Sequence, residues 1–189
     1  MHPRIQEVLE YLDTTRADLA KAVEAVSPAH RGQRPGPDRW SVAEVLEHLA
    51  IVESRVVQLA NGRIAAAKAA GLGPELETSP IIDSINRARI TDRSQRVTAP
   101  AMIQPQSGTD AASVWSALQQ ARANLREAVL AGDGLALTEI SHQHPALGLI
   151  NLYQWLVFVG SHEARHTAQI REIASELTAH SIAATDAPQ

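Results

Sequence analysis

Residues 160–169 read Gly160-Ser161-His162-Glu163-Ala164-Arg165-His166-Thr167-Ala168-Gln169 and contain two histidines four positions apart. Side chains at positions i and i+4 lie on the same face of a helix, so both imidazoles can reach one divalent ion. The spelling H-E-x-x-H also occurs in zinc peptidases. The location of a third ligand, downstream as in a zinc peptidase or upstream in the chain, therefore decides which kind of metal site the sequence encodes.

The segment around these histidines has the apolar periodicity of a helix that faces a core. His162 and His166 occupy positions in this stripe where an apolar residue is expected. The pattern therefore predicts that both rings point into the protein interior. The apolar members of the stripe are Leu152, Leu156, Val159, Ile170 and Ile173.

A third histidine interrupts a second apolar stripe, where His48 lies between Val45 and Val52. A single inward histidine is more often a core residue with one hydrogen-bond partner. Three imidazoles in one interior are different, because burying them unpaired would cost several kcal/mol, whereas one divalent ion satisfies all three acceptor nitrogens. The sequence therefore predicts a metal site formed by His48, His162 and His166.

The peptidase interpretation requires a third ligand after His166. In the extended motif H-E-x-x-H-x-x-G-x-x-H, a glycine turns the chain so that the last residue returns to the metal. Gln169 and Glu172 stand at the glycine and final positions here. Without the glycine the helix continues, and Glu172 faces about 240° around the axis from His166. A zincin-type peptidase is therefore disfavoured.

The composition limits the possible partners. The 189 residues carry a formal net charge of -4, which offers no basic surface to a nucleic acid. The sequence contains no cysteine, so disulfides, thiolate ligands and a cysteine nucleophile are excluded. The first residues lack a signal-peptide pattern, and no apolar run approaches membrane-spanning length. We therefore expect a cytoplasmic protein without a nucleic-acid or membrane partner.

Four stretches have helical periodicity and none has the alternation of a strand, which predicts an all-α fold. The expected helices cover about residues 2–26, 41–70, 110–131 and 146–179, with a short helix at 80–89. Ser41 and Glu44 form a capping box at the start of the second. With 44% hydrophobic residues, we expect one domain over residues 1–179 and a disordered tail over 180–189.

The connections between these helices predict their arrangement. Short loops join the first helix to the second and the third to the fourth, which favours antiparallel pairs. Prolines interrupt the long segment 71–109, so it can cross a whole helix length without forming a long helix itself. The second and third helices are therefore predicted to be parallel neighbours in a four-helix bundle with one long crossover.

The order and spacing of several short motifs resemble the DinB/YfiT-like metalloenzymes, and the resemblance covers most of the chain. These motifs are Trp40-Ser41, Glu44-Val45-Leu46-Glu47-His48-Leu49, Arg93, Pro100 to Pro105, His144-Pro145, Gly148, Trp155-Leu156, His162-Glu163, Arg165-His166 and Gln169-Ile170. The resemblance implies a four-helix bundle with His48, His162 and His166 as metal ligands. It also implies a homodimer, and either a transferase or isomerase that uses low-molecular-weight thiols or a metal-dependent hydrolase.

The expected chemistry follows from the ligand set. Three neutral imidazoles leave the full charge on a divalent ion, and an open fourth position can hold water or a substrate thiol. Zinc and nickel both suit imidazole ligands. We therefore expect a small-molecule substrate and a thiol-dependent S-transferase or a hydrolase. The alternative is a metal-binding module with a stress or interaction role and no catalysis.

Other residues carry secondary hypotheses. Glu163 is a candidate general base or orienting group for a ligand, although glutamate on a helix is usually solvated. His142 and His144 form a His-x-His pair that could bind metal, but a loop entering the last helix explains them more simply. A charged cluster in the crossover could contact an acidic substrate, and two tryptophans are expected in the core. The charged cluster consists of Arg89, Asp92 and Arg93, and the two tryptophans are Trp115 and Trp155. Glu44 and Glu47 flank the helical turn that carries His48.

Overall fold

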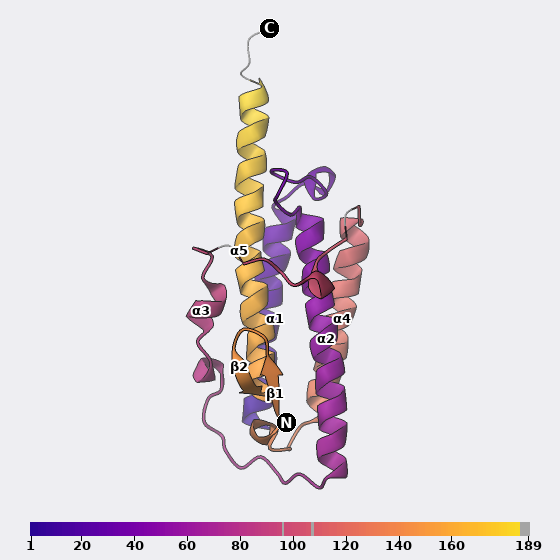
Figure 1. Ribbon diagram of the computed structural model, residues 1–189, viewed down its shortest axis with the longest axis vertical. Helices are drawn as coiled ribbons and strands as arrows, with labels where there is room; N and C mark the ends of the chain where they lie inside the picture. The colour runs from indigo at the N-terminus through magenta and orange to yellow at the C-terminus, as the bar shows by residue number, and fades with distance from the viewer. Residues whose placement is uncertain (96, 107, 186–189) are drawn as a thin grey trace.

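A computed structural model describes residues 1–95, 97–106 and 108–185, with side chains up to residue 179. Four long helices form an elongated bundle (Figure 1), and these are α1 (Pro3–Glu24), α2 (Val42–Ala69), α4 (Ala111–Ala131) and α5 (Leu152–Thr185). The connections contain shorter elements, namely η1 (Pro28–His30), η2 (Ile82–Ser84), α3 (Arg87–Thr91), η3 (Ala101–Ile103), η4 (Leu137–Glu139), β1 (Ser141–His144) and β2 (Gly148–Asn151).

The helices are arranged as two parallel pairs. Helix α1 packs on α5 and α2 packs on α4, and a further contact between α2 and α5 joins the pairs. In Figure 1, α1 and α5 run in one direction and α2 and α4 in the other, and the crossover returns the chain along the whole bundle. The prediction that the second and third long helices are parallel neighbours is confirmed.

The start of α2 follows the predicted capping box. Ser41 Oγ accepts a hydrogen bond from the Glu44 backbone N–H at 3.2 Å, and Glu44 Oε2 accepts one from the Ser41 N–H at 2.8 Å. Two free N–H groups of the first turn are thus paired. The Asp110 side chain accepts from Ser113 N–H and caps α4 in the expected place. These caps fix where the ligand-bearing helix α2 and its neighbour α4 begin.

Strands β1 and β2 form an antiparallel hairpin that the sequence did not predict. Each has only four residues, too few to show an alternation, and Pro145 lies in the turn between them. Gly148 has a φ of 79°, a conformation that glycine adopts without strain. Helix α5 therefore begins at Leu152 rather than directly after Pro145, while the prediction of an α-helical bundle is correct.

Two predicted boundaries also differ from the structure. The short helix expected at 80–89 is replaced by η2 and α3, because the Asn86 side chain accepts from the Arg89 N–H and starts a new helix there. Helix α5 continues to Thr185, which includes part of the segment expected to be disordered. Residues 186–189 of that predicted tail lie outside the described residues.

The interior contains two apolar clusters at different heights of the bundle. Trp155 is buried in one of them, and the half-buried Trp115 packs against the other, as predicted for both. Each long helix contributes apolar residues to both clusters, and polar residues lie between these two apolar stretches of the helix. Four of these are buried charged residues, one from each helix, namely Arg16, Glu53, Arg122 and Glu163. A polar layer therefore crosses the middle of the core.

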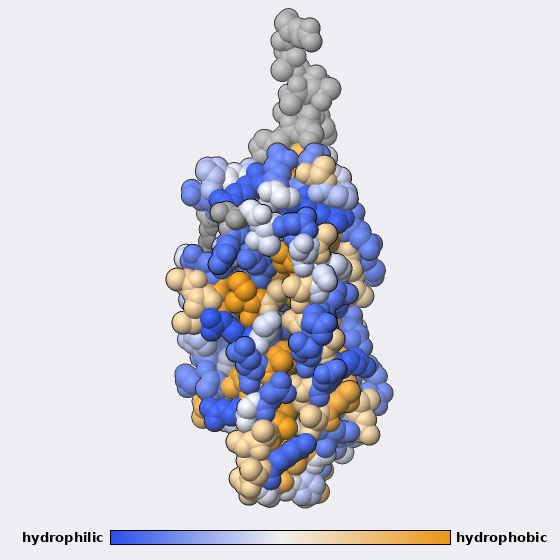
Figure 2. Space-filling view, turned by 90° about the vertical axis from the view of Figure 1, so that its right-hand side faces the viewer, coloured by the Kyte–Doolittle hydropathy of each residue, from blue (hydrophilic) through white to orange (hydrophobic). Residues whose placement is uncertain are grey.

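The outer surface is mainly hydrophilic on the side formed by α2 and α4, with smaller apolar areas between (Figure 2). Among the described residues, no helix combines the length and the apolar character that crossing a membrane requires.

Gly160 permits a close approach of α5 to α1. A Cβ at this position would lie 2.4 Å from Tyr11 Cε1, and the Tyr11 hydroxyl is itself held by Ser161 Oγ at 3.0 Å. We expect Gly160→Ala to lower the free energy of unfolding by about 1–3 kcal/mol, because the tyrosine must move. Urea denaturation followed by circular dichroism measures this change.

Gly62→Ala is the matched control, because Gly62 is an exposed residue within α2 and an added Cβ would have no neighbour within 4 Å. Here the better helix propensity of alanine should raise stability by up to about 1 kcal/mol. Equal effects of the two substitutions would contradict the close approach of α1 and α5.

Candidate metal centre

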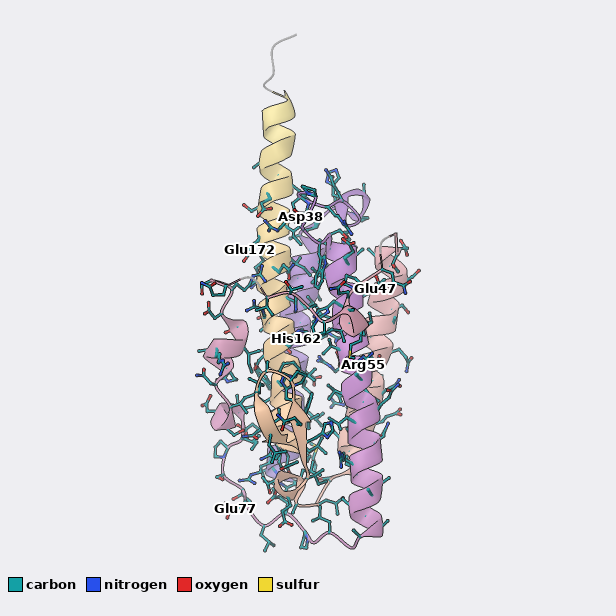
Figure 3. The ribbon with its side chains drawn as sticks, viewed as in Figure 1. Asp38, Glu47, Arg55, Glu77, His162 and Glu172 are labelled. Atoms are coloured by element: carbon teal, nitrogen blue, oxygen red, sulfur yellow. The ribbon has the colours of Figure 1, made fainter. Side chains whose placement is uncertain are left out.

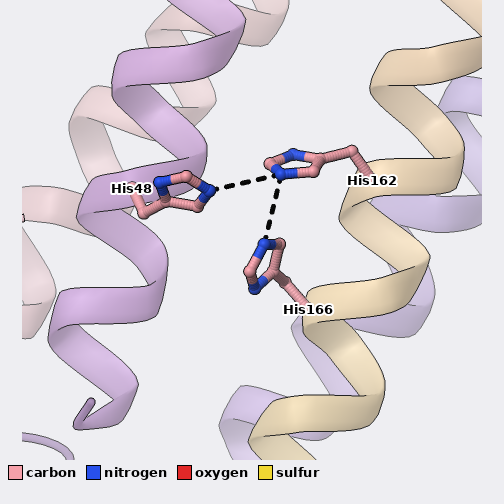
Figure 4. A group of neighbouring side chains, drawn as sticks. All are labelled: His48, His162 and His166. Atoms are coloured by element: carbon pink, nitrogen blue, oxygen red, sulfur yellow. Dashed lines mark hydrogen bonds between the residues drawn. The ribbon is translucent and has the colours of Figure 1, made fainter. Parts of the chain in front are cut away.

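The three predicted ligands meet at the interface of α2 and α5. His48 comes from α2, and His162 and His166 come from successive turns of α5 (Figure 4). His162 Nε2 lies 3.2 Å from Nε2 of His48 and 3.2 Å from Nε2 of His166. One nitrogen from each ring lies within 4.8 Å of the others, a grouping that could hold a metal ion. The structure therefore brings together the residues that the apolar stripes predicted.

Hydrogen bonds on the outer side of two rings fix their tautomers. His48 Nδ1 lies 2.7 Å from the backbone oxygen of Ile103, and His166 Nδ1 lies 2.8 Å from Gln169 Oε1. The same Gln169 oxygen faces Arg93 Nη1 at 3.5 Å, which supports this orientation of the amide. Both acceptors are oxygens, so each Nδ1 carries the proton and donates it. Both Nε2 atoms are therefore left with a bare lone pair toward the centre.

This arrangement cannot satisfy all three rings by hydrogen bonds alone. His162 Nε2 can donate a single proton, yet it faces the lone pairs of both His48 and His166. At least one of these acceptors therefore lacks a donor within the triad. A divalent cation would accept all three lone pairs at once, so the donor set fits a bound metal.

Aromatic rings surround the triad. Trp40 has its ring centroid 5.1 Å from that of His48, and Phe158 stacks on His162 at 5.3 Å. His48 and His166 are only 2% and 7% exposed, whereas His162 is half-buried. The centre is thus largely shielded from water, and His162 is its most accessible member.

Segment 101–106 of the crossover is held against α2 beside His48. Glu47 Oε2 accepts a hydrogen bond from Gln106 N–H at 3.1 Å, and Arg55 Nη2 donates to the Met102 oxygen at 3.0 Å. Glu47 and Arg55 lie on α2 on either side of the level of His162 (Figure 3). These bonds place the Ile103 carbonyl against His48, so the crossover supplies one of the orienting groups.

A family model of the DinB superfamily matches residues 11–170. The chain belongs to the DinB superfamily. It is similar to the uncharacterized protein YuaE of Bacillus subtilis (strain 168), with 24% identity over 174 residues that cover 89% of this chain and 98% of YuaE. The fold is similar to the crystal structure of TT2238, a four-helix bundle protein, with a TM-score of 0.59, 20% identity, and coverage of 89% of this chain and 98% of that one.

In this DinB-superfamily chain, Glu163 does not lie where a general base at the metal would have to lie. Its carboxylate accepts hydrogen bonds from Thr15 Oγ1 at 2.7 Å, Arg16 Nε at 2.7 Å and Arg122 Nη2 at 3.1 Å. Residue 163 is about 100° around the helix from its ligand neighbour His162 and faces α1 and α4 instead. The structure therefore places Glu163 in a buried ion-pair network, which argues against the predicted general base. The predicted role in supporting the ligands stays a prediction.

The other secondary candidates also have structural partners. His144 Nδ1 accepts hydrogen bonds from two backbone N–H groups of the hairpin turn, and His142 Nδ1 faces Arg63 at 2.8 Å, so the two do not form a shared site. The remaining pairs are Glu44 with Arg34, Asp92 with the side chain and N–H of Ser94, and Arg93 with Glu172, while Arg89 is exposed.

Burial keeps the triad neutral. It lowers the pKa of His166 to about 3, lowers that of His162 well below its ordinary value and lowers that of His48 despite the Ile103 carbonyl. The positive charges of Arg165 and Arg93 act in the same direction at His166, as would protonation of His48. Neutral imidazole is the form that binds a metal, so near neutral pH few protons compete for these nitrogens.

These depressed pKa values predict an acid-sensitive fold in the metal-free protein. The unfolded chain takes up protons at His166 below about pH 6.5, whereas the folded chain does not until its pKa of about 3, so stability is lost as the pH falls. Between about pH 7 and pH 5, His166 should account for about 2 kcal/mol of lost unfolding free energy. Urea denaturation at both pH values measures this loss, and His166→Gln should reduce it.

His30→Gln is the control, because it removes an exposed imidazole that has no part in the triad. The parent and this control should lose equal stability on acidification. If His166→Gln behaved like them as well, the buried neutral state of His166 would be contradicted.

Proposed function

We propose that the protein is a metal-dependent enzyme in which His48, His162 and His166 bind one divalent ion that activates a thiol or a water molecule. The convergence of three Nε2 atoms in a largely buried centre, two of them with bare lone pairs, supports this proposal most directly. Membership of the DinB superfamily and the resemblance of the ligand motifs to its metalloenzymes agree with it. Zinc and nickel are the ions that best suit three imidazole ligands.

The bound ion would supply Lewis-acid chemistry, because three neutral ligands leave its charge uncompensated and a fourth position free for a thiol or water. The protein contributes orientation and exclusion of water. The Ile103 carbonyl and Gln169 hold two of the rings with their Nε2 atoms inward. Trp40 and Phe158 pack against the rings and keep them dry. His162 is the most exposed of the three ligands, so a substrate would approach from its side.

Thiol transfer is preferred over hydrolysis because of the position of Glu163. A zinc peptidase with the H-E-x-x-H motif uses this glutamate as a general base, but here two arginines and a threonine engage its carboxylate. A thiol activated by the ion would need no adjacent carboxylate as its base. The favoured reaction is therefore the transfer of a low-molecular-weight thiol to a small electrophile.

An activity screen tests the proposal. Metal-free protein, and protein reconstituted with zinc or nickel, is assayed with several low-molecular-weight thiols and an aryl chloride electrophile, and separately with nitrophenyl esters. We expect thiol conjugation that requires the metal and disappears in His48→Ala. Ester hydrolysis alone would identify a hydrolase instead. Stoichiometric metal binding with no turnover of either kind would contradict the enzyme proposal and favour a non-catalytic metal-binding module.

A further inference from the structure

A closed ring of four buried charges lies beside the triad. Arg16 donates to Glu53 at 2.8 Å and to Glu163 at 2.7 Å, and Arg122 donates to the same two carboxylates at 2.5 Å and 3.1 Å. All four side chains are at most 10% exposed. Each arginine therefore bridges both glutamates, and the charges of the ring balance.

The ring has a regular relation to the triad. The two carboxylates belong to α2 and α5, which carry the three histidines, whereas the two guanidiniums belong to α1 and α4, which carry none. Glu163 lies between His162 and His166 in the sequence, and Glu53 follows His48 by five residues. The ring thus connects the same two helices that must be correctly spaced for the three imidazoles to meet.

The arginines are themselves anchored to the opposite helix. Arg16 of α1 donates to the backbone oxygen of Leu118 at 3.1 Å and to Gln119 Oε1 at 2.7 Å, both on α4. Arg122 of α4 donates to the backbone oxygen of Leu12 on α1. These bonds leave the guanidiniums little freedom, because a planar fork with several fixed donors accepts few geometries. The spacing between Glu53 and Glu163 is therefore set by rigid groups.

We propose that Arg16, Glu53, Arg122 and Glu163 are positioning residues that set the separation of α2 and α5 and so the geometry of the histidine triad. The inference rests on the proposed function where it concerns metal binding. An apolar core could hold the helices together, but it tolerates small shifts of one helix along another. The ring connects them by directional bonds at the level of the ligands, and a metal site needs its ligands placed to within about 0.5 Å.

The test compares Glu53→Gln and Glu163→Gln with Glu75→Gln. Glu75 forms another buried ion pair, with Arg4 at 3.3 Å, and lies in the crossover outside the ring. Metal affinity is measured by competition with a chromophoric chelator, and the cobalt-loaded proteins are compared by visible absorption. In metal-free protein, the ring nitrogens of the histidines are followed by two-bond ¹H–¹⁵N NMR spectra. Thermal unfolding shows how far each variant is destabilised.

We expect Glu53→Gln and Glu163→Gln to weaken metal binding by about tenfold or more, a loss typical of groups that support metal ligands. They should also change the cobalt spectrum and shift the ring nitrogens of the triad. Glu75→Gln should lower the melting temperature and leave all three site measurements as in the parent. Arg122→Lys keeps the charge but cannot bridge both carboxylates in the same way. It is the substitute test if the glutamine variants fail to fold, and it should change the same three site measurements.

Each result separates the two proposals. Suppose that the parent binds no metal, but that the imidazole nitrogen signals of the triad shift only in the variants of the charged ring. The positioning role then stands, and the proposed metal-dependent function fails. If folded Glu163→Gln, Glu53→Gln or Arg122→Lys keeps the parental metal affinity and ring-nitrogen shifts, the positioning role is overturned.

Discussion

Glu53→Ala is expected to lower the free energy of unfolding by about 3–5 kcal/mol, the usual effect of breaking a buried ion pair from one side. The substitution leaves Arg16 and Arg122 buried with only Glu163 to neutralise them. Glu53 is 3% exposed, so water cannot replace the lost carboxylate without opening the core. Urea denaturation of the metal-free protein at neutral pH measures the loss.

An exposed ion pair between α1 and α4, the helices that carry Arg16 and Arg122, provides the control. Asp13 of α1 and Arg126 of α4 lie 3.1 Å apart, with side chains 59% and 46% exposed. Asp13→Ala should cost less than about 1 kcal/mol, because water solvates the freed charge. If both variants lost a similar amount of unfolding free energy, removal of Glu53 would not leave an uncompensated buried charge, and the expectation would be contradicted.

His48→Ala is expected to reduce the affinity for zinc by more than about 100-fold, because even the loss of a group that only supports a ligand commonly costs 10–100-fold. His48 is the one member of the triad that comes from α2, so its removal leaves only the i, i+4 pair on α5. His162→Ala and His166→Ala should have effects of the same order. Titration against a chromophoric chelator gives the affinities.

His142→Ala separates this expectation from a general effect of removing a histidine. His142 lies in the hairpin, where Arg63 contacts its ring, and takes no part in the triad. Its replacement should leave the affinity for zinc unchanged. Parental affinity in His48→Ala, or a loss in His142→Ala equal to that in His48→Ala, would be incompatible with the triad as the metal site.

The apolar stripes predicted both the bundle and the meeting of the three histidines, for a physical reason. A polar side chain at a core position must have a partner inside the protein, and three residues of the same metal-binding type on two helices point to a shared one. The caps at Ser41 and Asp110 were equally predictable, since they depend on residues only three positions apart.

The charged ring carries the same kind of signal in the sequence. Arg16 lies between Leu12 and Leu19, and Arg122 between Leu118 and Leu125, at the helical spacing of buried positions. Two basic and two acidic residues on four inward stripes would have predicted a core ion-pair network. The same pattern assigns Glu163 to that network rather than to the role of a base.

Other features have no signature of this kind. His48 is oriented by the backbone oxygen of Ile103, and any residue at that position could supply the same group. The hairpin depends on four-residue strands whose pairing is fixed by the turn and by the start of α5, so local alternation could not show it. The path of the crossover over the triad follows from contacts such as that of Arg55 with Met102, which join residues far apart in sequence.

We propose that His48, His162 and His166 share one divalent ion. Anomalous diffraction at the zinc absorption edge, from crystals of the zinc-loaded protein, tests it directly. A single strong peak is predicted at about 2.0–2.1 Å from Nε2 of all three histidines, the usual zinc–imidazole distance. A zinc peak bonded to two or fewer of these nitrogens, or located at other residues while the triad holds none, would contradict the account.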